Sequence, residues 1–108
     1  MNHLPLQTPV CTRLGCELPV LLAGMGGVAR SELVAAVARA GGYGILGMVR
    51  ETPDLIAQEV AAVRALTDRA FAVNLIPAAT DPALLDAELG TCLDLGVPAM
   101  CFFWDVVP

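Results

Sequence analysis

The sequence predicts an α/β fold in which strand–helix units repeat around a parallel sheet. Four short apolar runs start at regular intervals of 25, 26 and 27 residues along the 108-residue chain. Each interval is long enough for one helix. Hydrophobic residues make up 56% of the chain and charged residues only 16%, as expected where strands are covered on both faces. The runs cover residues 19–23, 44–48, 70–76 and 97–103.

The intervals between these runs carry signals for helix starts and stops. Ser31 is expected to cap the first helix, which ends at a pair of glycines after Ala40. Thr52 and Asp81 each precede a proline, an arrangement typical of a capped helix start. Gly96 is expected to end the last helix. Apolar residues follow at helical spacing in both later segments: Ile56, Val60, Val63 and Leu66, then Leu85, Leu89, Cys92 and Leu93.

Composition excludes several classes of function. Six basic residues against eleven acidic ones give a net charge of −5 without a basic cluster, so nucleic-acid binding is not expected. No apolar run reaches the roughly 18 residues of a membrane span. The first residues lack a secretory signal, so a cytoplasmic location is predicted. The four cysteines form no C-x-x-C pair and His3 is the single histidine, so neither a metal site nor a structural disulfide is expected.

A glycine turn follows the first apolar run and precedes the first helix. The segment Gly24-Met-Gly-Gly-Val-Ala29 fits the G-x-G-x-x-G/A pattern of dinucleotide-binding folds. Glycines there let the backbone approach a phosphate at a helix N-terminus. Such folds also place an acidic residue at the end of the second strand, and Glu51 is a late candidate for it. An NAD-binding domain and a tight turn without a ligand are both compatible with this pattern.

The order of motifs along the chain resembles the nitronate monooxygenases, a family of FMN-dependent barrels formerly called 2-nitropropane dioxygenases. The segments that carry the resemblance are 12–19, 19–29, Ala40-Gly-Gly-Tyr-Gly-Ile-Leu-Gly47, Phe71-Ala-Val-Asn-Leu75 and Ala99-Met-Cys-Phe-Phe-Trp104. They cover nearly the whole chain. The resemblance implies the first half, about four βα units, of a TIM-type (β/α)8 flavin barrel with parallel strands. Residues 1–108 then form a single partial domain, in which 1–17 are a lead-in with a possible small hairpin around Gly15.

The resemblance also implies which residues face the cofactor. The family's loop after the first strand lies against the flavin, which points to Ala23, Gly24 and Met25 as FMN-binding residues. An Asn at the end of the third strand commonly binds FMN, which points to Asn74 and to either the ring or the phosphate. A structural role for Asn74 is the alternative. Two departures are Gly24, where the family usually has proline, and Trp104, where it more often has glycine; Trp104 is expected to pack in the core or to cover a pocket.

The activity implied by the resemblance is oxidation of an alkyl nitronate by dioxygen to a carbonyl compound and nitrite, with the nitronate bound in a complete barrel. A flavin-dependent enoyl-acyl-carrier-protein reductase shares the same opening and is an alternative. A non-catalytic half-barrel that binds flavin or serves in assembly is another. In the family, the catalytic histidine and the phosphate-binding loops come from later strands, so no residue here is assigned a catalytic role. The open barrel edges also predict possible self-association.

Overall fold

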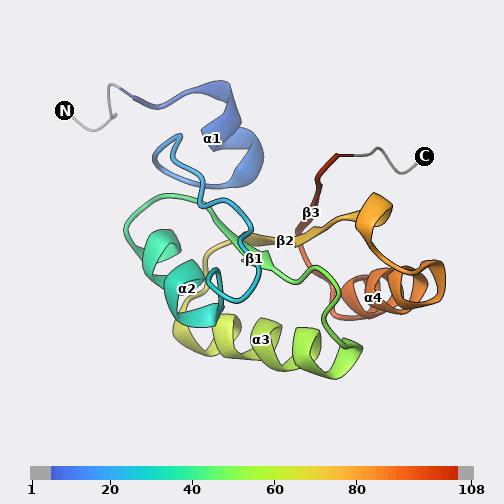
Figure 1. The fold of residues 1–108 in the computed structure, drawn as a ribbon. Coiled ribbons are helices and arrows are strands. Elements are labelled where there is room, and N and C mark those ends of the chain that lie inside the picture. The colour runs from blue at the N-terminus through green and yellow to red at the C-terminus, as the bar shows by residue number, and fades with distance from the viewer. Residues whose placement is uncertain (1–5, 105–108) are drawn as a thin grey trace.

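A parallel sheet forms the centre of the computed structural model, which describes residues 6–104 (Figure 1). The strands β1 (Gly44–Gly47), β2 (Phe71–Leu75) and β3 (Ala99–Phe102) are hydrogen-bonded in that order and all run parallel. The first predicted strand is reduced to a short pairing beside β1. There the Tyr43 N–H donates to the Val20 carbonyl at 2.9 Å, and the Leu22 N–H donates to the Tyr43 carbonyl at 2.9 Å. Four parallel segments therefore lie side by side in sequence order.

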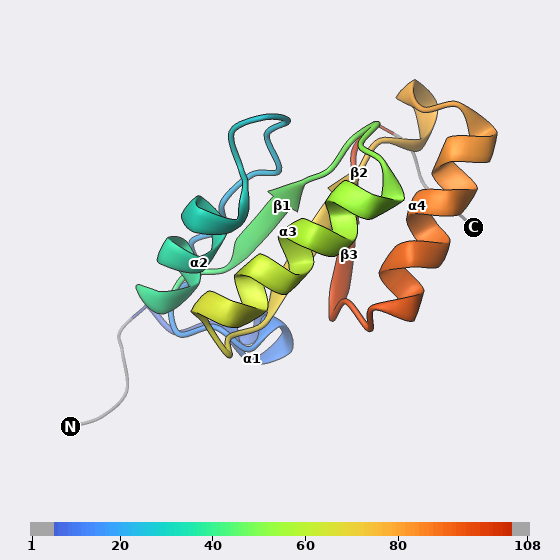
Figure 2. The same ribbon diagram turned by 90° about the horizontal axis from the view of Figure 1, so that it is seen from below.

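The three crossover helices lie in one layer against one face of this sheet. They are α2 (Ser31–Arg39), α3 (Pro53–Leu66) and α4 (Pro82–Asp94), and α3 contacts both of the others (Figure 2). A short 3-10 turn, Pro77–Ala79, precedes α4. Sequential parallel strands with every crossover helix on one side form the wall of a (β/α)8 barrel, because a doubly wound sheet carries helices on both faces. The fold is thus the predicted α/β architecture of a TIM-type barrel.

Two of the predicted helix caps are present and one is not. The Thr52 hydroxyl accepts from the Leu55 N–H at 3.2 Å. The Asp81 carboxylate accepts from the N–H groups of Ala83 and Leu84. The prediction for Ser31 is wrong, because Ser31 is the first residue of α2 and its side chain makes no cap. Its N–H instead donates to the Glu59 carboxylate of α3 at 2.9 Å, so a tertiary contact satisfies this helix start.

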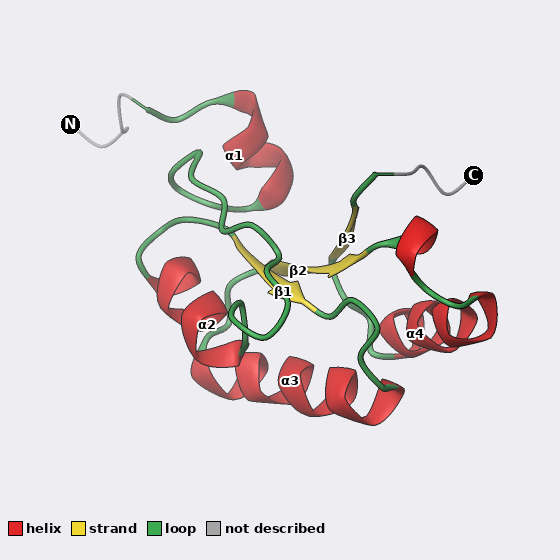
Figure 3. Cartoon of the chain, viewed as in Figure 1, coloured by secondary structure: helices red, strands yellow, loops and turns green. Residues whose placement is uncertain are grey.

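The lead-in forms a helix rather than a hairpin. Helix α1 (Pro9–Leu14) lies on the face of the sheet opposite to the crossover helices (Figure 3). Pro9 suits the first helical position, and Gly15 has φ of +77°, the left-handed conformation that ends helices. The glycine that suggested a hairpin turn is therefore a helix C-cap. His3 lies outside the described residues.

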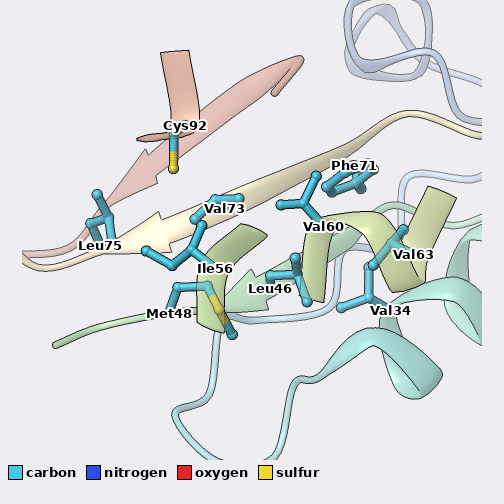
Figure 4. Close-up of a cluster of buried hydrophobic side chains, with 10 residues drawn as sticks. All are labelled: Val34, Leu46, Met48, Ile56, Val60, Val63, Phe71, Val73, Leu75 and Cys92. Carbon is cyan, nitrogen blue, oxygen red and sulfur yellow. The ribbon is translucent and has the colours of Figure 1, made fainter. Parts of the chain in front are cut away.

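Two apolar clusters cover the two faces of the sheet. The outer cluster lies between the sheet and the crossover helices (Figure 4) and consists of Val34, Leu46, Met48, Ile56, Val60, Val63, Phe71, Val73, Leu75 and Cys92. The inner cluster lies under α1 and consists of Cys11, Cys16, Tyr43, Ile45 and Ala72. Alternate residues of β2 belong to opposite clusters, as a two-sided strand requires. Trp104 belongs to neither, since it is 81% exposed, so the expectation that it packs in the core is not met.

Two absences apply to residues 6–104. No helix among them is long and apolar enough to cross a membrane. Within the same range, no three His, Cys, Asp or Glu side chains are grouped closely enough to hold a metal ion.

Candidate functional site

The candidate site lies at the carboxyl ends of the strands, on the inner face of the sheet. Gly47 of β1 is the register partner of Asn74 of β2, and Asn74 is the partner of Cys101 of β3. These three residues form a row across neighbouring strands. The carboxyl ends of the strands carry the active sites of (β/α)8 barrels, so the row lies where a ligand is expected.

Asn74 is the polar member of this row and is completely buried. Its Nδ2 donates to the Leu75 carbonyl at 3.3 Å and to the Cys101 carbonyl at 3.1 Å. Because both partners are acceptors, the amide orientation is fixed: the nitrogen faces the carbonyls and Oδ1 faces away. Oδ1 has no hydrogen-bond partner among the described residues. A buried unsatisfied acceptor costs about 1–3 kcal/mol, so this atom is suited to a donor on a ligand.

The glycine loop lies directly against this row. A Cβ at Gly24 would lie 2.6 Å from Asn74 Cγ and 2.7 Å from Asn74 Oδ1, so only glycine leaves room for the Asn74 side chain. A Cβ at Gly47 would lie 2.8 Å from the Met25 backbone nitrogen. The loop therefore contacts β1 and β2 through its main chain.

Backbone hydrogen bonds fix the loop in this position. The Met25 carbonyl accepts from the N–H groups of Val28 and Ala29 at 3.2 and 2.8 Å. The Gly47 N–H then donates to the Ala29 carbonyl at 2.9 Å, which links the loop to the end of β1. The Met48 N–H donates to the Asn74 carbonyl at 3.2 Å and links β1 to β2 at the same level.

Of the four sequence-predicted site residues, the structure brings Gly24, Met25 and Asn74 together. Ala23 directly precedes Gly24 in the loop and is exposed. The Met25 side chain is 41% exposed, while its backbone lies on Gly47. Cys101 lies beside Asn74, and burial raises the pKa of its thiol. The row and the loop together thus offer an acceptor, two glycines and a protonated thiol.

A buried carboxyl group that the sequence interpretation missed lies behind this edge of the sheet. Glu88 of α4 is completely buried, and neither of its oxygens makes a hydrogen bond of good geometry with any residue that the structure describes. Burial is the main cause that raises its pKa to about 7, and the charge of Glu51 raises it further, while the nearby backbone of Glu51 and Arg50 lowers it. The sequence signal for this burial is the spacing of Glu88, which shares a helical face with Leu85 and Cys92.

The dinucleotide interpretation finds little support in this geometry. Glu51, its candidate for holding ribose hydroxyls, forms an ion pair with Arg30. A dinucleotide-binding sheet also reverses its strand order after the third strand. Here β3, the fourth parallel segment, pairs with β2, the third, so the order does not reverse.

Comparisons with known proteins agree with the barrel interpretation. The family model described as nitronate monooxygenase matches residues 8–89. A probable nitronate monooxygenase of Staphylococcus saprophyticus is 40% identical over 72 residues, which cover 67% of this chain and 20% of that protein. The (3aS,4S,5R,7aS)-5-hydroxy-7a-methyl-1-oxo-octahydro-1H-indene-4-carboxyl-CoA dehydrogenase of Mycobacterium tuberculosis is 45% identical over 76 residues, which cover 70% of this chain and 21% of that protein.

Solved structures show the same similarity. FabK of Thermotoga maritima matches with a TM-score of 0.81 and 34% identity, over 89% of this chain and 30% of that one. Nitroalkane oxidase of Streptomyces ansochromogenes matches with a TM-score of 0.75 and 31% identity, over 84% of this chain and 35% of that one. The chain spans about a fifth of the length of the curated relatives it matches.

Proposed function

Because this chain belongs to the nitronate monooxygenase family, we propose that it supplies one wall of an FMN site in an enzyme that oxidises an alkyl nitronate with dioxygen. The products are a carbonyl compound and nitrite. The remaining walls of the site belong to the parts of a complete barrel that this chain does not match in its relatives. Residues 1–108 act as a single partial domain of that barrel.

One observation carries this proposal: the unpaired, buried Oδ1 of Asn74 at the carboxyl end of β2. Oδ1 can only accept, so it fits a ligand that donates. A flavin offers a ring N–H and ribityl hydroxyls as donors, whereas its phosphate offers mainly acceptor oxygens. Asn74 therefore suits the ring or the ribityl chain. The sequence had pointed to either the ring or the phosphate as the partner of Asn74.

The loop residues complete this wall through their backbone. Gly24 covers Asn74 Oδ1, so a ligand reaches that atom only when the loop shifts away from β2. Gly27, with φ of +74°, gives the loop the backbone freedom to shift. Ala23 and Met25, both exposed, bind beside Asn74 and orient the cofactor. FMN, when bound, supplies the electron transfer between nitronate and dioxygen.

A titration of the purified chain with FMN tests the proposal, with flavin fluorescence as the signal. Gly24→Ala places a Cβ in the space of the Asn74 side chain and is expected to weaken FMN binding about tenfold, or about 1.4 kcal/mol. Gly26→Ala is the matched control, because a Cβ there meets nothing within 4 Å. Equal FMN affinity of the two variants would refute the assignment of this wall.

A second candidate is a flavin-dependent reductase or dehydrogenase that acts on a thioester, such as an enoyl-acyl-carrier-protein reductase. It is favoured by the similarity to FabK and by the 45% identity to a dehydrogenase whose name specifies a CoA thioester. Nitrite release from an alkyl nitronate supports the first candidate. Oxidation of a nicotinamide cofactor that depends on an enoyl thioester supports the second. FMN binding without either turnover supports a non-catalytic half-barrel.

The open edge of the sheet supports a further proposal about assembly. Val20 and Leu21 are exposed on the edge beside β1, where they present apolar side chains. We therefore propose that copies of this chain associate through this edge. Sedimentation of the chain at increasing concentration tests it, and a monomer at all concentrations would contradict it.

A further inference from the structure

Two cysteines meet at the end of α1, at the opposite end of the inner face from Asn74. Cys11 and Cys16 belong to the inner cluster with Tyr43, Ile45 and Ala72, and both thiols are free. We propose that Cys11 and Cys16 are a redox modification site, at which a hydroperoxide converts the two thiols into a reversible disulfide.

The way in which α1 ends brings the two thiols together. The N–H groups of Gly15 and Cys16 both donate to the Cys11 carbonyl, at 2.8 and 3.0 Å, around the left-handed Gly15. This is the hydrogen-bond pattern of a glycine-terminated helix, in which the residue after the glycine packs on the residue five positions before it. In most proteins that contact is hydrophobic. Here both positions are cysteine, and both side chains are buried in the same inner cluster.

The surroundings give the two thiols different roles. The Cys11 Sγ lies 3.6 Å from the Thr8 hydroxyl. Hydrogen bonding from Thr8 lowers the pKa of Cys11, whereas burial raises the pKa of Cys16. The thiolate is the reactive form, so Cys11 attacks and Cys16 resolves.

Access of the oxidant follows from the size of α1. In the closed structure Cys11 is 1% exposed and Cys16 is 7% exposed. A helix of six residues is marginally stable by itself, so local opening at its end exposes both sulfurs without unfolding the sheet.

The chemistry balances with one hydroperoxide. The Cys11 thiolate attacks an oxygen of the hydroperoxide, the O–O bond breaks, and an alcohol or water leaves with a proton. Cys11 is then a sulfenic acid. The Cys16 sulfur attacks the Cys11 sulfur, the S–S bond forms, the S–O bond breaks, and water leaves with the Cys16 proton. Two electrons pass from the thiols to the peroxide, and a dithiol reductant reverses the change.

The other two cysteines serve as internal controls. Cys92 lies in the outer cluster, on the other face of the sheet. Cys101 lies on β3, where it is partly buried and packs against the inner cluster without belonging to it. Cys92 does lie at a glycine-terminated helix end, that of α4, but the residue whose N–H donates to its carbonyl there is Val97, at 3.1 Å, so the position that Cys16 holds in α1 carries no thiol. Cys101 lies on a strand.

Peptide mapping of the purified full chain tests the proposal. The chain is treated with hydrogen peroxide, its remaining thiols are alkylated, and it is digested with trypsin. Cleavage after Arg13 separates the two cysteines into peptides 1–13 and 14–30, while Cys92 and Cys101 stay in peptide 70–108. Peroxide should reduce the alkylated cysteines from four to two and join peptides 1–13 and 14–30. Reduction should restore all four.

Two results would overturn the proposal: four thiols that remain free under peroxide, or a cross-link that joins peptide 70–108. Cys16→Ala is expected to abolish the cross-link and leave Cys11 as a sulfenic or sulfinic acid. Cys92→Ala, the matched control, is expected to retain the cross-link.

A second pair of variants tests whether the helix end supplies the geometry. Gly15→Ala strains the left-handed residue without a packing clash, since its Cβ would lie 3.9 Å from the Ala70 Cβ. It should shift the disulfide equilibrium in a glutathione buffer toward the dithiol. Gly96→Ala imposes the same backbone strain after α4, where a Cβ meets nothing, and should leave that equilibrium unchanged. Equal behaviour of the two variants would exclude a role for the α1 helix end.

Discussion

The side chain of Asn74 occupies the space into which a Cβ at Gly24 would project. The two residues lie 50 positions apart in the sequence, on the loop after the first strand segment and at the carboxyl end of β2. Their contact fixes the distance between the glycine loop and the sheet.

This contact predicts that the effects of two substitutions depend on each other. Gly24→Ala forces the loop or the Asn74 side chain to move and is expected to cost about 1–3 kcal/mol in the free energy of unfolding. Asn74→Ala removes the atoms that the new Cβ would meet. The double variant should therefore lose less stability than the sum of the single variants, as urea denaturation can measure. Strict additivity would show that the loop is not held against Asn74.

Gly47 and Gly90 are expected to respond to alanine in opposite directions. A Cβ at Gly47 would meet the Met25 main chain, which cannot rotate away, so Gly47→Ala should destabilise the fold and displace the loop. Gly90 lies inside α4, where a Cβ meets nothing within 4 Å. Gly90→Ala should raise the free energy of unfolding by about 0.5–1 kcal/mol, because alanine is the better helix former. Thermal denaturation of both variants provides the measurement.

Glu88 is expected to make stability depend on pH. Its pKa is about 7 in the folded chain, above its ordinary value of 4.5, so the folded state retains a proton that the unfolded state has released. Stability is then full below about pH 4.5 and falls as the pH rises toward 7, by a total on the order of 3 kcal/mol. Glu51 and Cys92 are the titratable groups coupled to Glu88.

Glu88→Gln should remove this part of the pH dependence, because the amide stays neutral. Asp86→Asn, on the same helix but exposed, is the control and should keep it. Denaturant unfolding of the three proteins between pH 5 and pH 8 provides the comparison. A Glu88→Gln profile as steep as that of the parent would exclude Glu88 as the source.

The helix starts provide a further contrast. Thr52→Ala removes the hydroxyl that accepts from the Leu55 N–H and should cost about 1 kcal/mol. Ser31→Ala should cost much less, because only the backbone N–H of Ser31 takes part in satisfying its helix start. Chemical denaturation distinguishes the two, and equal losses would contradict the assignment of Thr52 as the cap.

The sequence predicted the features that depend on local order. The spacing of apolar runs gave parallel strands and crossover helices because each signal lies within one segment. Thr52 and Asp81 were identified as caps for the same reason, since a cap and its partner are three residues apart or fewer. Asn74, by contrast, was selected through the resemblance to a family that has an asparagine at the end of its third strand, and the structure does place Asn74 at the carboxyl edge of the sheet.

The features that the sequence did not predict depend on contacts between distant segments. Ser31 is not a cap, because it is the first residue of α2 and its N–H donates to Glu59 of another helix. Gly15 ends a helix, whereas the same glycine is equally suited to a hairpin turn. Glu88 is buried although glutamate is usually exposed, and only the packing of α4 shows it. The sequence does not show that Asn74 Oδ1 is a free acceptor, because the Cys101 carbonyl that accepts from Asn74 Nδ2 lies on the next strand.

The glycine loop contacts the sheet through its main chain, so its side chains are not needed to hold it in place. The atoms that hold the loop in place belong to the backbone of Met25 and Ala29, while the side chains of Met25 and Val28 are exposed. Those side chains can be exchanged without altering how the loop is anchored. Variation at these two positions is therefore compatible with an unchanged backbone path of the loop.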